Sequence, residues 1–114
     1  VGKPIAVWLM RNVRELYVLG HNSDLGILKQ ADLVISGVGK AGLIKSEMVK
    51  NGAGVIDFVY SSGVGDFDDS NPHNLAFYTP TPGGTGPILV AKLLENFYTL
   101  CSLGEKKEDF KKTL

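Results

Sequence analysis

The sequence predicts a small α/β domain, a parallel sheet with helices on both faces in three layers. Short apolar strands alternate along the chain with helical segments, a pattern typical of parallel sheets covered by helices. The strand segments are continuously apolar rather than alternating, as in strands that are buried on both faces. A length of 114 residues allows one such domain and little more.

Each predicted element follows from local composition. β-branched and aromatic residues between glycine or polar breaks predict strands at 17–19, 33–36, 54–58 and 75–78. A helix is predicted at 4–12, where Pro4 suits the first turn. One or two helical turns are expected at 25–30, and Ser46 is predicted to cap a short helix to residue 49. The longest helix is predicted at 88–103, with Gly104 as its C-terminal cap.

Composition excludes several classes of function. The 12 Lys and Arg balance 12 Asp and Glu, whereas a nucleic-acid or anionic-membrane surface needs a basic excess. A single cysteine cannot form an internal disulfide, and its spacing from the two histidines is not that of a zinc site. No apolar run approaches the ~20 residues of a membrane span. We therefore expect a cytoplasmic protein with a small-molecule ligand.

The domain organisation predicted is one domain at 1–104, followed by a charged tail at 105–114. The chain begins on a predicted helix and without an initiator Met. In a doubly wound sheet, a strand ending in a phosphate-binding turn feeds the first helix. We expect that strand and turn to precede Val1, so that the chain is a piece of something longer.

A glycine-rich turn follows the predicted strand at 33–36. Gly37, Gly39 and Gly42 match the G-x-G-x-x-G spacing, whose glycines let backbone N–H groups approach a pyrophosphate. A helix should begin inside such a motif, yet residues 43–46 look like an extended approach to a later helix. Two interpretations stay open: a pyrophosphate-binding turn, or a tight turn on the ligand side of the sheet.

The segment 79–87, between a predicted strand and the longest predicted helix, is rich in proline and glycine. Prolines stiffen the backbone, and glycines leave room for a ligand to approach it. Pro87 lies where the helix should begin, so that the N-terminal amides of the helix face the loop. Because α/β proteins bind ligands at the carboxyl ends of strands, we interpret this loop as a ligand-binding wall in preference to a purely structural turn.

Other polar residues give weaker signals. His21, Asn22 and Ser23 follow a predicted strand and can hydrogen-bond a nucleotide ribose or phosphate, although a lone loop histidine is more often structural. Ser46 is interpreted as a helix cap rather than a nucleophile, because no Ser-His-Asp arrangement is legible.

The remaining candidates are interpreted structurally. Asp66, Asp68 and Asp69 lie in a polar loop, where closely spaced acids are predicted to be solvated rather than to bind a metal. Cys101 lies on an apolar helix and is predicted to pack in the core.

The proline- and glycine-rich loop carries a family resemblance. Residues 80–87 read PTPGGTGP, which resembles the PVPGGVGP signature of the bifunctional methylenetetrahydrofolate dehydrogenase/methenyltetrahydrofolate cyclohydrolase family. Other stretches agree in the same order: 1–4 with the end of GRSxxVGxP, 31–43 with QADxxxxAxGxPG, 48–57 with MVKPGAVVIDVG, and 64–68 with VGDVDF.

The resemblance implies that the chain is most of the Rossmann-like NAD(P)-binding domain of a two-domain enzyme. Such an enzyme oxidises methylenetetrahydrofolate with NADP or NAD and hydrolyses the methenyl product to formyltetrahydrofolate. The catalytic Lys would lie on an N-terminal domain absent here, so the chain alone is expected to be inactive. The implied partners are the tetrahydrofolate substrate, that missing domain and a second copy in a homodimer, with no nucleic acid and no membrane.

The resemblance also implies site residues, with no catalytic residue and no metal in this chain. It makes the absent turn the pyrophosphate site, in place of residues 37–42. The residues implied to face folate and nicotinamide are Pro82, Gly83, Gly84, Thr85 and Gly86. Those implied to bind the cofactor are Val1, Gly2, His21, Asn22, Ser23, Gly37, Val38, Gly39, Phe58, Val59 and Tyr60.

Two departures from the family pattern favour an alternative. Val59 replaces a glycine, with Phe58 and Tyr60 adding bulk where the nicotinamide ribose should lie, and Leu89 replaces a threonine. The alternative is a degenerate, non-catalytic nucleotide-binding module with a structural or regulatory role.

Overall fold

The computed structural model describes residues 2–60 and 62–113, and the side chains of that part as far as residue 105. A short helix α1 (Gly2–Leu9) precedes a 3-10 helix η1 (Leu25–Gln30) and strand β1 (Leu33–Ser36). A second 3-10 helix η2 (Ser46–Met48) leads to strands β2 (Gly54–Asp57) and β3 (Phe77–Tyr78). The long helix α2 (Thr85–Thr113) completes the described chain.

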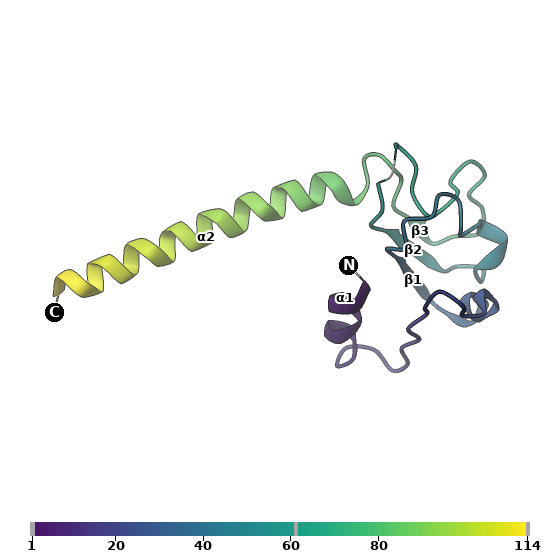
Figure 1. The fold of residues 1–114 in the computed structure, drawn as a ribbon, viewed down its shortest axis with the longest axis horizontal. Coiled ribbons are helices and arrows are strands. Elements are labelled where there is room, and N and C mark those ends of the chain that lie inside the picture. Colours follow the sequence, from purple (N-terminus) through teal and green to yellow (C-terminus); the bar gives the residue numbers. More distant parts are fainter. Residues whose placement is uncertain (1, 61, 114) are drawn as a thin grey trace.

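The three strands form a parallel sheet in the order β1-β2-β3, which confirms the predicted fold class (Figure 1). Ser36 pairs with Asp57, and Val55 pairs with Tyr78. Because the strands are parallel, their carboxyl ends lie at one edge, and the loops that follow them meet there.

The hydrophobic core covers one face of the sheet. Val34 and Val55 lie side by side on this face, and the Phe67 ring packs on Tyr78 at a centroid distance of 5.4 Å. Segments from η1 and from the loops after β1 and β2 supply the rest of this layer. The buried apolar residues are Leu28, Val34, Ile44, Val49, Ala53, Val55 and Phe67.

The second face differs from the prediction. Leu33 and Phe77 on that face are 40% and 51% exposed, so these strands are not buried on both faces within the described chain. Helix α1 contains no buried residue, and α2 extends away from the sheet (Figure 1). The longest dimension is therefore 62 Å, against 31 and 26 Å for the other two.

Three local predictions are wrong. Residues 17–19 form no strand, because no neighbouring strand pairs with them in the described part of the chain. Helix α2 does not end at Gly104 but continues to Thr113. Lys45, not Ser46, occupies the N-cap of η2, since the Ser46 hydroxyl instead donates to the Asn71 carbonyl.

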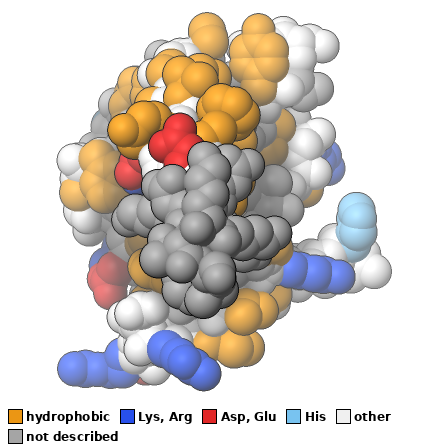
Figure 2. All heavy atoms as spheres, turned by 90° about the vertical axis from the view of Figure 1, so that its left-hand side faces the viewer, with side chains coloured by type: hydrophobic (Ala, Val, Ile, Leu, Met, Phe, Trp, Pro, Cys, Tyr) orange, Lys and Arg blue, Asp and Glu red, His pale blue; other side chains and the backbone are white. Residues whose placement is uncertain are grey.

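Cys101 is also not in a core. It lies exposed on α2, in a stretch where the side chains of residues 91–101 are all exposed. Large apolar side chains along the same helix are 55–74% exposed, and Figure 2 shows hydrophobic side chains on the surface above and below the centre of the view. An apolar helix sequence predicted burial, and the described chain does not supply the surface that would provide it.

Candidate functional site

Three loops converge at the carboxyl edge of the sheet. The glycine turn 37–40 follows β1, residues 58–60 follow β2, and the proline- and glycine-rich loop 79–84 follows β3. One of the predicted ligand-binding loops therefore follows each strand, and all three lie at the carboxyl edge of the sheet. Two buried aspartates, Asp57 and Asp66, hold this arrangement together through their carboxylates and, in Asp57, the backbone.

Asp66 organises the turn after β1. Its Oδ1 accepts hydrogen bonds from the backbone N–H groups of Gly39, at 3.0 Å, and Lys40, at 2.8 Å. Its Oδ2 accepts from the Val38 N–H at 2.7 Å and from the Ser36 hydroxyl. Successive N–H groups pointing at one anion form a nest, the geometry that binds phosphate in other proteins. Here the chain's own carboxylate occupies it, which argues against the pyrophosphate interpretation of this turn.

Asp57 connects the other two loops. Its carboxylate accepts from the N–H groups of Val59, at 2.8 Å, and Phe67, at 2.9 Å. The hydroxyls of Thr79 and Thr85 donate to its backbone carbonyl at 3.3 and 3.2 Å. The start of α2 and the proline- and glycine-rich loop are thereby tied to the end of β2.

The surfaces left free on these loops include apolar side chains and bare backbone, together with the exposed Lys40. Val38 is 60% exposed and Tyr60 71% exposed. Gly39 and Gly83 have positive φ, and a Cβ on either would meet nothing within 4 Å. Gly84 differs, because a Cβ there would overlap the Pro80 carbonyl. A flat ring can therefore approach the backbone closely at Gly39 and Gly83, while Gly84 is required by the loop's own packing.

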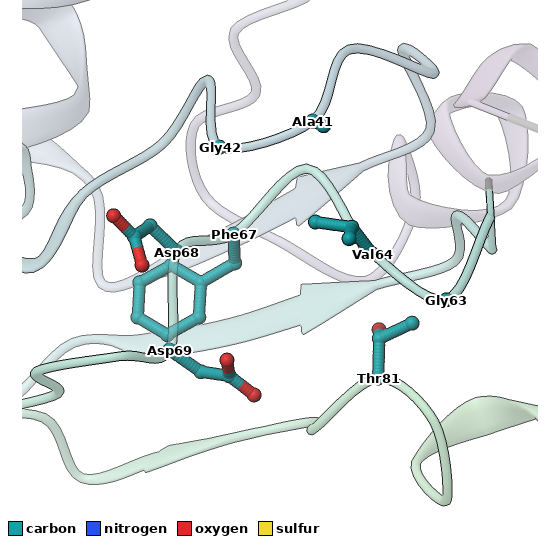
Figure 3. A pocket seen from close by; sticks show the side chains of 9 residues that line it. Ala41, Gly42, Gly63, Val64, Phe67, Asp68, Asp69 and Thr81 are labelled. Atoms are coloured by element: carbon teal, nitrogen blue, oxygen red, sulfur yellow. The ribbon is translucent and has the colours of Figure 1, made fainter.

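A cavity of about 350 Å³ lies beside this edge, between the loops after β1, β2 and β3 (Figure 3). The Thr81 side chain points into it toward Gly63 and Val64. Asp68 and Asp69 add two carboxylates, and Ser70 donors lower the pKa of Asp68 below its ordinary value. Negative charge here disfavours a phosphate. The cavity is lined by Ala41, Gly42, Gly63, Val64, Gly65, Phe67, Asp68, Asp69 and Thr81.

The remaining predicted site residues come before β1 in the chain and do not belong to the three loops at this edge. Ser23 is half-buried, and its hydroxyl accepts from the Gly20 N–H at 2.8 Å, while His21 and Asn22 are exposed. Gly2 is exposed in the first turn of α1. Val1 lies outside the described residues.

The structure corrects the interpretation of Asp66. Sequence reasoning predicted a solvated carboxylate, yet Asp66 is fully buried. The role of Asp57 was also missed. Nothing local in the sequence distinguishes Asp66 from Asp68 and Asp69 beside it, because its donors at residues 36–40 meet it only in the fold. No three potential metal-ligating side chains come together among the described residues.

A parallel sheet whose proline- and glycine-rich loops meet at its carboxyl edge defines an α/β domain of the kind that binds nucleotides. Residues 1–104 match the family model described as "Tetrahydrofolate dehydrogenase/cyclohydrolase, NAD(P)-binding domain". The chain belongs to this family. It is 43% identical over 103 residues to the bifunctional protein FolD of Halothermothrix orenii, covering 84% of this chain but 36% of that protein.

Solved structures agree with this assignment. The bifunctional FolD enzyme of Campylobacter jejuni is 36% identical with a TM-score of 0.75, covering 84% of this chain and 37% of that one. The Trypanosoma brucei FolD, solved with NADP cofactor and an inhibitor, is 35% identical with a TM-score of 0.62 over 70% of this chain and 31% of that one. The chain thus spans well under half the length of these relatives. Among its described residues, neither helix has the length and apolar character needed to cross a bilayer.

Proposed function

We propose that this chain binds NAD(P) and forms one wall of the folate site in a methylenetetrahydrofolate dehydrogenase/cyclohydrolase. The observation that carries the proposal is the convergence of the three loops at one edge of the sheet, with the PTPGGTGP segment tied to the end of β2 through Thr85. The family match and the NADP complex of a relative support the choice of cofactor.

The free surfaces of the site suit a dinucleotide. The open backbone at Gly39 and the exposed Val38 offer a flat apolar contact after β1. Phe58 and Tyr60 offer a second apolar contact after β2. We assign the cofactor to Gly2, His21, Asn22, Ser23, Gly37, Val38, Gly39, Phe58, Val59 and Tyr60, and folate to Pro82, Gly83, Gly84, Thr85 and Gly86. NAD(P) would supply the acceptor for a hydride from the folate methylene carbon.

The chain's own residues would act by position. The rigid loop 80–86 would hold the folate ring against the nicotinamide, and the loops after β1 and β2 would fix the cofactor, a contribution of proximity and orientation. The groups that move protons during water addition to the methenyl product would come from a separate catalytic domain. A second copy in a homodimer and a cytoplasmic location belong to the same proposal.

The alternative of a degenerate, non-catalytic module rests on two departures from the family pattern, and the structure weakens the argument from one of them. Val59 is not at positive φ, and its N–H donates to the Asp57 carboxylate, so the turn accommodates a side chain where the family has glycine. Leu89 is 60% exposed in the first turns of α2 and removes a hydroxyl that the family supplies. We propose that this change affects affinity rather than the existence of the site.

The test is an assay of the natural gene product that carries these residues. Purified protein is given methylenetetrahydrofolate with NADP or NAD, and the reduced nicotinamide and the methenyl and formyl products are measured separately. We expect cofactor-dependent oxidation followed by hydrolysis. Binding of NADP without either turnover would favour the regulatory module, and absence of both binding and turnover would overturn the proposal.

A further inference from the structure

We infer that Asp66 is a positioning residue for the cofactor, whose carboxylate fixes the turn 37–40 in the shape against which NAD(P) lies. The inference rests on the proposed function. It adds a role for a residue that contacts no ligand itself: Asp66 is fully buried beneath the turn, while Val38 above it is 60% exposed.

The carboxylate of Asp66 has all of its acceptor positions filled. Each oxygen accepts two hydrogen bonds, Oδ2 from the hydroxyl of Ser36 and the N–H of Val38, Oδ1 from the N–H groups of Gly39 and Lys40. An ionised carboxylate is an acceptor only, and this set of donors matches its capacity. Neither ion pair found among the described side chains involves Asp66, and its four hydrogen-bond donors are all neutral groups.

The turn needs such an anion. Gly39 has a φ of +84°, and the flanking N–H groups all point inward rather than into a sheet or helix. Without the carboxylate these N–H groups, whose hydrogen bonds to Asp66 are partly buried, would lose their acceptor. Charge-assisted hydrogen bonds are stronger than neutral ones, and so they hold the backbone of the turn more firmly.

Asp66 is itself held from the opposite side. Its carbonyl accepts from the Ile44 N–H at 2.9 Å, and the next residue, Phe67, donates its N–H to Asp57 at 2.9 Å. Ile44 and Phe67 form a parallel bridge. The backbone of Asp66 is therefore anchored in the core, and its carboxylate positions the turn 37–40.

Asp66→Asn in the natural gene product tests the inference. The variant keeps the shape of the side chain. Its NH2 group, however, is a donor and would face two other donors, from which it cannot accept hydrogen bonds. We expect the dissociation constant for NADP, measured by titration calorimetry, to rise about tenfold or more. The KM for NADP should rise with it, while the KM for methylenetetrahydrofolate changes much less, because the loop 79–84 makes no hydrogen bond to Asp66. Glu47→Gln, which removes an exposed carboxylate, is the matched control and should leave both constants unchanged.

The outcomes separate the two proposals. A variant that melts at lower temperature but binds NADP as tightly as the wild type would show a merely structural role and overturn the inference, with the proposed function intact. A wild-type protein that binds neither NADP nor NAD would overturn the proposed function, and the inference with it.

Ser36→Ala provides the test if Asp66→Asn does not fold. It removes one donor and leaves the carboxylate in place, so we expect about threefold weaker NADP binding. Amide hydrogen exchange at Gly39 and Lys40 should accelerate in the same variant. Unchanged exchange together with unchanged NADP affinity would overturn the inference.

Discussion

The loops at the carboxyl edge of the sheet and helix α2 meet at Thr85, yet they are stabilised in opposite ways. The loops have little regular structure, but buried carboxylates accept hydrogen bonds from residues distant in sequence, such as Asp57 from Phe67 and Asp66 from Lys40. Helix α2 has regular hydrogen bonds but almost no side-chain burial as far as residue 105. The difference teaches that order in the candidate site depends on tertiary contacts, whereas order in α2 is local.

The largest expected effect tests the loops. A Cβ on Gly65 would overlap the Asp57 carboxylate and crowd the Thr81 hydroxyl. Gly65→Ala should therefore lower the free energy of unfolding by about 2–3 kcal/mol, measured by urea denaturation. The control is Gly63→Ala, where the space is open but φ is +81°, so only backbone strain of about 1–2 kcal/mol is expected. A smaller loss for Gly65→Ala than for Gly63→Ala would contradict the description of the loops as tightly packed.

The same contrast explains what sequence could and could not predict. The strands at 33–36 and 54–57 were predicted nearly to the residue, because β-branched runs between glycines are local signals. The convergence of the loops followed from parallel topology. The burial of Asp66 could not be predicted, since its donors at Ser36 and Lys40 lie far away along the chain and meet it only in the fold.

The predicted strand at 17–19 and the predicted end of α2 at Gly104 were wrong because both depend on tertiary context. Tyr17, Val18 and Leu19 have strand composition, but a strand needs a partner, and these side chains are 39–66% exposed. Gly104 resembles a cap in sequence, yet an exposed helix can continue through a glycine at a modest cost. In both cases the local composition is typical of the predicted element, but tertiary contacts decide whether the strand forms and where the helix ends.

A smaller effect of opposite sign is expected in α2. Gly104 lies within the helix, and a Cβ there would meet nothing within 4 Å. Gly104→Ala should stabilise the helix locally by about 0.5–1 kcal/mol, seen as increased helical circular dichroism and slower amide exchange near residue 104. The urea midpoint of the sheet, followed by the NMR signals of Val34 and Val55 in its core, should not move, because residues 86–101 of α2 are all exposed. A parallel rise in that midpoint would show that the two regions unfold together.

The smallest effect concerns Asp68, at the border of the loop cluster. The side-chain hydroxyl and backbone N–H of Ser70 donate to its carboxylate at 2.6 and 3.1 Å, and they lower its pKa below the ordinary value of 3.8. The folded protein therefore binds fewer protons than the unfolded chain near this pH. The resulting stability is fully present above pH 3.8 and is lost as the pH falls through the lowered pKa. Carboxyl carbon shifts followed by NMR should show Asp68 titrating below the ordinary value of 3.8. Ser70→Ala should bring the pKa of Asp68 back toward the ordinary value. A wild-type Asp68 whose pKa is not lowered would show that the Ser70 hydrogen bonds do not form in solution.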